Sequence, residues 1–215
     1  MISLDIISDP ICPWCYIGKA NLDRALEGNP DHPFLITWHP FQLNPDMPAG
    51  GVDRRAYLEA KFGKDQAGHF YARIEEAARS AGLDVDFSKI SRTPNTVDPH
   101  RLIHWGRLEG RQTLVVSQLF HRYFRNGDDI SDHAVLLEVA RTVGMDTELV
   151  RRLLASDADV AEVREEDSRA RRMGVNGVPV FVIGGRQAVT GAQPAEFWSR
   201  VISELTDATA KPGSA

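Results

Sequence analysis

The chain has 215 residues, 42% of them hydrophobic and 26% charged, which is ordinary for a soluble globular protein. Its formal net charge of -5 argues against nucleic acids and anionic membrane surfaces as partners, because both attract basic faces. No apolar run approaches the roughly 18 residues of a transmembrane helix. The first residues include an acid and lack the basic start of a signal peptide, so we expect a cytoplasmic protein.

The N-terminal region predicts a β-α-β unit. Residues 1–8 predict a buried strand, which Pro10 ends. A helix is expected from Pro13 to about residue 26, because glycine, asparagine and proline follow at 28–30. Residues 34–38 are rich in β-branched and aromatic side chains and predict a second strand.

A long stretch of helical periodicity follows a loop at 44–51, and glycines mark the ends of most of its helices. Asp98 and Pro99 are the residue types of an N-cap and a first helical position, so we expect one helix to begin there. The predicted helices span 54–62, 66–80, 99–110, 113–125, 133–143, 147–155 and 159–173.

Strand character returns at 178–183 and 187–190, around a glycine-rich turn, and a closing helix is expected over 194–205. The order β-α-β, helical block, β-β-α predicts an α/β protein with one sheet built from both ends of the chain. A large all-helical insertion then separates the two halves of the sheet. The predicted units are a discontinuous domain of 1–43 with 174–210, an insertion of 44–173 and a disordered tail of 211–215.

The two cysteines of the chain, Cys12 and Cys15, lie in one short segment. A disulfide closing so short a loop adds little stability, which favours a catalytic or metal-binding role. At the start of a helix, Cys12 meets unpaired N–H groups and the positive end of the helix dipole, and both favour the nucleophilic thiolate. Pro13 suits the first turn because it has no N–H. We expect Cys12 to be exposed and to attack, and Cys15 to be more buried and to resolve the mixed disulfide.

A structural zinc site needs four ligands, and the sequence offers no second pair beside the cysteines, so we expect no metal and no organic cofactor. The second signal is the pair Val178 and Pro179 at the start of a strand. A cis bond before Pro179 would turn the backbone of Val178 toward the cysteines. Together the two signals are more specific than either alone.

These motifs resemble those of the DsbA superfamily of thioredoxin-fold proteins, most closely its FrnE-like branch. The 2-hydroxychromene-2-carboxylate isomerases and kappa-class glutathione transferases are more distant relatives of that superfamily. The similarity covers nearly the whole chain. The matching segments are 9–18, 38–45, 95–96, 100–102, 119–120, 123–124, 174–175, 177–179 and 191–193.

The resemblance implies a thioredoxin-like fold with a helical insertion, a cis bond before Pro179 and thiol-disulfide oxidoreductase activity in the cytoplasm. It implies protein or small-molecule substrates that carry thiols or disulfides, with glutathione as one candidate thiol partner. Some FrnE-like proteins have a further cysteine pair near the C-terminus, and this chain does not, so Cys12 and Cys15 have no internal relay.

Several other residues are candidates for the site. Pro13, Trp14, Val178 and Pro179 are expected to contact substrate, although Trp14 could equally pack on the insertion. His100 is expected on a helix surface or, alternatively, in the cleft with Asn95, where it would assist proton transfer. The charged run at 164–172 is expected to be a solvated helix face.

Three functional hypotheses follow from these patterns. The first is dithiol-disulfide exchange, in which Cys12 attacks and Cys15 resolves. The second is a glutathione-dependent isomerase or transferase of the 2-hydroxychromene-2-carboxylate isomerase type. Cysteine at position 12 argues against it, because those relatives usually have serine there. The third is a peptide-binding or chaperone-like module without catalysis.

Overall fold

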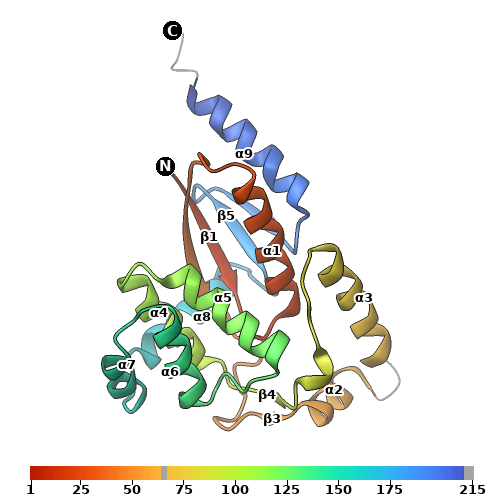
Figure 1. The fold of residues 1–215 in the computed structure, drawn as a ribbon, viewed down its shortest axis with the longest axis vertical. Helices are drawn as coiled ribbons and strands as arrows, with labels where there is room; N and C mark the ends of the chain where they lie inside the picture. The colour runs from red at the N-terminus through yellow and green to blue at the C-terminus, as the bar shows by residue number, and fades with distance from the viewer. Residues whose placement is uncertain (64–66, 211–215) are drawn as a thin grey trace.

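A computed structural model describes residues 1–63 and 67–210, and it confirms an α/β fold with one central sheet (Figure 1). The sheet has four strands in the order β2-β1-β5-β6. Strand β1 is parallel to β2 and antiparallel to β5, which is antiparallel to β6. The strands are β1 (Ile2–Ser8), β2 (Phe34–Pro40), β5 (Val180–Ile183) and β6 (Gln187–Thr190).

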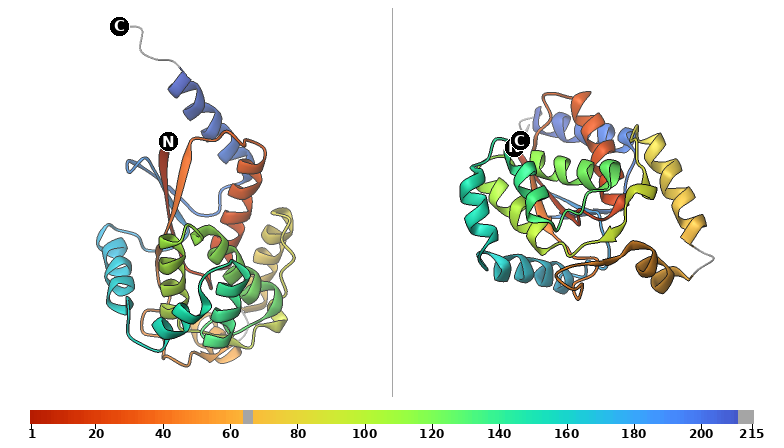
Figure 2. Two further views of the ribbon diagram at one scale, coloured as in Figure 1. Left: turned by 60° about the vertical axis from the view of Figure 1, so that its left-hand side comes forward. Right: turned by 60° about the horizontal axis from the view of Figure 1, so that its bottom comes forward.

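Alternation along the strands separates the two faces of the sheet. Leu4 and Ile6 of β1 belong to the main apolar cluster, together with Trp198. Ile7 and Ala170 lie in a second cluster on the opposite face. Figure 2 shows helices α1 (Pro13–Glu27) and α9 (Ala195–Ala210) on one side of the sheet and α8 (Val160–Arg172) on the other.

The segment between β2 and β5 is mostly helical, as predicted, and its aromatic side chains join the same cluster as the sheet. Its apolar core is therefore continuous with that of the sheet, and the division into a domain and an insertion stays a prediction. The helices are α2 (Arg54–Phe62), α3 (Ala67–Ser80), α4 (Val97–Leu108), α5 (Gln112–His121), α6 (His133–Thr142), α7 (Thr147–Leu154) and α8. A 3-10 turn, Phe87–Lys89, lies between α3 and α4.

Several details differ from the expectations. A two-residue antiparallel pair, β3 (Val52–Asp53) with β4 (Arg92–Thr93), lies within the helical segment, because two residues are too short to show a periodicity. Helix α5 ends at His121 and continues as a π-helical turn, Arg122–Asn126. The closing helix α9 extends to residue 210 rather than 205.

The start of α4 also differs, because its N-cap is Thr96 and not Asp98. Asp98 lies inside the first turn, where its carboxylate is 2.7 Å from Arg101 and 3.0 Å from His133. The carboxylate is thus engaged by the side chains of Arg101 and His133 and does not cap the helix. None of the described helices is long and apolar enough to cross a membrane. Residue 66 and the predicted tail at 211–215 lie outside the described residues.

Candidate active site

Cys12 is the N-cap of α1, and Pro13 is the first residue of that helix, as the sequence predicted. The backbone N–H of Cys12 donates to the carbonyl of Asp9 at 2.9 Å, which closes the turn between β1 and the helix. No side chain caps this helix, so the sulfur of Cys12 lies near the positive end of the helix dipole without a competing acceptor at the cap.

The sheet register explains how Cys12 meets a segment far away in the sequence. Ile7 near the end of β1 pairs with Val180 at the start of β5, so the residues just after β1 lie beside those just before β5. The Val178–Pro179 peptide bond is cis. The sulfur of Cys12 is 3.6 Å from the carbonyl oxygen of Val178, so the thiol donates to the backbone that the sequence singled out.

The expected exposure of Cys12 is wrong. Cys12 is 4% exposed and Cys15 is 1% exposed, so both thiols are buried, although Cys15 is the deeper of the two. The cause is the close approach of Val178, which covers the sulfur of Cys12. Both thiols are free in this structure.

Cys15 lies in surroundings that oppose its ionisation. Burial raises the pKa of the Cys15 thiol well above its ordinary value, and the hydrogen bond and charge of Cys12 raise it further. The hydroxyl of Ser8 and the backbone N–H of Asp9 face the same sulfur and lower that pKa by hydrogen bonding. Cys15 is therefore a thiol at neutral pH, with donors placed to receive its thiolate.

Asp9 joins the cysteine turn to the segment after β2. Its carboxylate accepts the N–H of Ile11 at 3.2 Å and the N–H of Leu43 at 2.7 Å. Complete burial raises the pKa of the Asp9 carboxyl to about 7, and these two hydrogen bonds oppose that rise. Asp9 is not among the predicted site residues, although the sequence places this acid three residues before the first cysteine.

Three further side chains hold the same segment, residues 41–43. His100 is 3% exposed, and its Nε2 lies 3.2 Å from the carbonyl oxygen of Phe41. Asp167 accepts the N–H of Gln42 at 2.7 Å. Arg171 donates to the carbonyl of Gln42 and to Asp167, and its guanidinium lies 4.2 Å from the ring centroid of Phe41. These contacts fix the backbone that packs beside Val178.

Two expectations are therefore wrong in part, the placement of His100 and the full exposure of the charged run at 164–172. His100 is neither on a helix surface nor in an open cleft, because its ring is buried under Phe41. Within the run, Asp167 is buried at 5% exposure, since the segment after β2 covers it. The side-chain amide of Asn95 donates to the carbonyl of Met47, and its oxygen accepts the backbone N–H of Val97. The side chain of Asn95 is therefore engaged in loop contacts.

Stability should depend on pH in opposite ways through Asp9 and His100. Burial lowers the pKa of His100 from 6.5 to about 4, so the folded state loses stability as the pH falls through this window. The pKa of Asp9 rises from 3.8 to about 7, so the folded state loses stability as the pH rises through that window. Each slope is at most about 1.4 kcal/mol per pH unit.

Urea denaturation of Asp9→Asn and His100→Gln between pH 4.5 and 6.5 measures these slopes. Relative to the wild type, the free energy of unfolding of Asp9→Asn should rise with pH and that of His100→Gln should fall. Other titrating groups cancel in each difference. Slopes of the same sign in the two variants would contradict the assigned environments.

Gly18 lets α1 approach the cis-proline segment. A Cβ at this position would lie 3.2 Å from the Cγ of Pro179 and 3.3 Å from the ring of Phe181. We expect Gly18→Ala to lower the free energy of unfolding by about 1–3 kcal/mol, because the added methyl overpacks the contact. Gly28→Ala is the matched control, since its Cβ would meet backbone at an ordinary 3.6 Å. Equal stability of the two variants would contradict this packing.

Trp14 is half-buried and packs beside Ile17 and Ile74, so it contacts the helical segment. Packing on the insertion was one of the two roles expected for this residue. Tyr16 stacks on Phe120 and Phe124, with ring centroids 5.1 and 5.5 Å away. These contacts attach the first turns of α1 to the helices that cover it.

Among the described residues, no group of three or more His, Cys, Asp or Glu side chains could hold a metal ion.

Residues 3–203 match the family model of the DSBA-like thioredoxin domain. A solved structure of a probable DsbA oxidoreductase from Streptomyces coelicolor is 31% identical, with a TM-score of 0.85, and the match covers 100% of this chain and 93% of that one.

Two more distant structures share the fold. A 2-hydroxychromene-2-carboxylate isomerase is 15% identical with a TM-score of 0.74, over 97% of this chain and 98% of that one. The cytosolic disulfide reductase DsbM from Pseudomonas aeruginosa, solved with GSH, is 18% identical with a TM-score of 0.70, over 95% of this chain and 99% of that one.

Proposed function

The chain belongs to the family of DSBA-like thioredoxin domains, and from this premise we propose that it is a thiol-disulfide oxidoreductase that works through Cys12 and Cys15. The observation that carries the proposal is the contact of Cys12, at the start of α1, with the backbone carbonyl of Val178, with Cys15 in the first turn of the same helix. Its substrates are proteins or small molecules that carry thiols or disulfides, and it needs no metal or organic cofactor.

The proposed cycle begins at Cys12. Its thiolate attacks one sulfur of a substrate disulfide, and the other substrate sulfur leaves with the electron pair. Cys15 then loses its proton and attacks the sulfur of Cys12, which releases the second substrate thiol and leaves the Cys12–Cys15 disulfide. The substrate disulfide has been reduced by two electrons and the protein dithiol oxidised by two. The same steps in reverse oxidise a substrate dithiol.

The surroundings of the two sulfurs support this division of roles. Cys12 lies at the start of α1 and is the outer of the two thiols, whereas burial keeps Cys15 protonated until the mixed disulfide forms. In the protein without substrate, Cys12 contacts the carbonyl of Val178. When Cys12 forms a disulfide with the substrate, that carbonyl can instead accept a hydrogen bond from an extended substrate segment. Pro13 and Trp14 are half-buried beside Cys12 and supply apolar contact surface.

Glutathione is the small-thiol partner that the fold comparison favours, since DsbM was solved with GSH and is described as cytosolic. On this basis we propose a cytoplasmic site of action. A glutathione-dependent isomerase is the second candidate, supported by the structural likeness to 2-hydroxychromene-2-carboxylate isomerase. Conversion of a chromene carboxylate by the Cys15→Ser variant would favour that candidate, because isomerisation needs no resolving thiol.

Two assays test the leading proposal in both directions of electron flow. The wild type should accelerate the reduction of insulin disulfides by a small thiol or the oxidative refolding of a reduced protein. The third hypothesis, a chaperone-like module, predicts instead that suppression of client aggregation survives replacement of both cysteines by serine. No acceleration in either assay would refute the oxidoreductase.

A further inference from the structure

Arg54, the first residue of α2, is a half-buried cation with neutral neighbours. Its Nε donates to the hydroxyl of Tyr71 at 3.1 Å, and its Nη1 donates to the hydroxyls of Thr93 at 3.3 Å and Tyr123 at 3.4 Å. Among the residues that the structure describes, no carboxylate pairs with this guanidinium and none accepts from its Nη2. A half-buried cation without a counter-ion costs free energy, which favours an anion that binds to it from outside.

Arg54 lines a hollow of about 350 Å³, a volume that suits a small molecule. Much of the lining is apolar or aromatic, and it includes the buried Leu58 and Ile90 and the half-buried rings of Tyr71 and Phe87. Beside such walls a charge is screened less than in bulk solvent, so the attraction between the guanidinium and a bound anion is stronger there.

Two acids also line the hollow, and each has another neighbour. Asp53 is exposed, and its carboxylate accepts the N–H of Ala56 as the N-cap of α2. Glu59 lies four residues after Arg55 on the same helix, so these two opposite charges face each other. Within the described chain, Arg54 is therefore the charge that is left for a ligand, and its Nη2 can donate two hydrogen bonds to an oxyanion.

Two aromatic rings connect Arg54 to the cysteine turn. Arg54 contacts the hydroxyl of Tyr123, and the ring centroid of Tyr123 lies 4.9 Å from that of Phe124. Phe124 in turn stacks on Tyr16 at 5.5 Å, and Tyr16 directly follows the second cysteine. Figure 1 shows α2, β3 and β4 toward the same end of the molecule as the N-terminal end of α1. A carboxylate bound at Arg54 must therefore lie several bonds from the reacting sulfur, as the end carboxylates of a short peptide do.

We propose that Arg54 binds a carboxylate of the substrate, so that the protein prefers small disulfides that carry one, such as oxidised short peptides. This inference rests on the proposed function. Arginine suits the role because its planar fork matches the two oxygens of a carboxylate. Arg54 takes no part in the exchange itself. It holds the substrate while Cys12 attacks, so it sets the substrate concentration that the reaction needs and not the rate of the bound complex.

Three disulfides separate carboxylate binding from the chemistry. Glutathione disulfide carries free carboxylates, the disulfide of glutathione diethyl ester has them blocked, and bis(2-hydroxyethyl) disulfide is uncharged. The reduced protein is mixed with increasing concentrations of each and quenched with acid, and its oxidised fraction is measured by alkylation and mass spectrometry. We expect Arg54→Met to raise the half-saturating concentration of glutathione disulfide about tenfold or more and to leave the maximal rate unchanged, because a charged hydrogen bond is lost. The rates with the other two disulfides should not change.

Arg141→Met is the matched control, since it removes an exposed arginine of α6. An unchanged half-saturating concentration in Arg54→Met would overturn the carboxylate site and leave the proposed function intact. An equal loss with glutathione disulfide and its diethyl ester would also overturn the site, because the effect would not depend on the carboxylates. If circular dichroism shows that Arg54→Met does not fold, Arg54→Gln decides, since its amide can still donate to the hydroxyls but carries no charge. A wild type that reacts with none of the three disulfides would refute the proposed function itself.

Discussion

Replacement of Cys12 by serine should lower the rate of disulfide exchange by at least about a thousandfold, because a neutral hydroxyl cannot act as the attacking thiolate. The change is small in volume and leaves the cap position of α1 with a residue that caps helices well. The fold should therefore survive. Insulin reduction measures the rate, and circular dichroism checks the fold.

Cys15→Ser is the informative partner of that variant. It retains the attacking sulfur, so it should react once with a disulfide and accumulate as a mixed disulfide at Cys12. Mass spectrometry of the protein after exposure to oxidised glutathione measures the adduct. An active Cys12→Ser protein, or an adduct on Cys15 in the wild type, would contradict the assigned roles.

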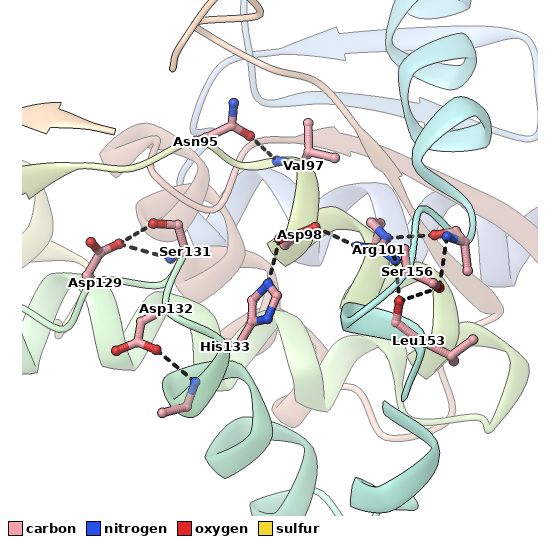
Figure 3. A network of polar contacts seen from close by, with 12 residues as sticks. Asn95, Val97, Asp98, Arg101, Asp129, Ser131, Asp132, His133, Leu153 and Ser156 are labelled. Carbon is pink, nitrogen blue, oxygen red and sulfur yellow. Dashed lines mark hydrogen bonds and ion pairs between the residues drawn. The ribbon is translucent and has the colours of Figure 1, made fainter. Parts of the chain in front are cut away.

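Replacement of Arg101 by methionine should lower the free energy of unfolding by about 3–5 kcal/mol, because it leaves buried acceptors without their donor. Arg101 is 2% exposed and donates to the carbonyls of Leu153, Ser156 and Ala158 at 2.6–2.7 Å (Figure 3). It also pairs with Asp98. One side chain thus holds the connection between α7 and α8, and α8 carries Asp167 and Arg171.

Urea denaturation measures this loss, and Arg141→Met is the matched control. Arg141 is 68% exposed in its side chain and pairs with Glu138 on the same helix, a solvent-screened interaction that contributes little to stability. A loss for Arg101→Met as small as that of the control would show that the carbonyls find other donors.

Local signals made much of this structure predictable. Cys12 and Pro13 occupy the predicted N-cap and first helical position. Proline is common at the first position of a helix, because its fixed φ suits the helix and its missing N–H is not needed there. The strand signals at both ends of the chain predicted a sheet that joins them. The segment at 178–179 was recognisable because its proline precedes a buried strand.

The polar interior was not predictable in the same way. His100 and Asp167 are polar residues on helices, where local periodicity favours the surface, and only the approach of residues 41–43 buries them. Asp167 and Gln42 are 125 residues apart, so their contact depends on how α8 docks onto the sheet. The burial of Cys12 likewise comes from Val178, 166 residues away, and no local pattern contains it.

A redox titration of the cysteine pair tests the central claim most directly. The protein is equilibrated in glutathione buffers of increasing potential, the free thiols are alkylated, and the masses are read. We predict one two-electron transition in which Cys12 and Cys15 close a disulfide with each other, at a potential between about -270 and -120 mV. Two thiols that stay free in the most oxidising buffer, or that each take up glutathione without joining, would contradict the account.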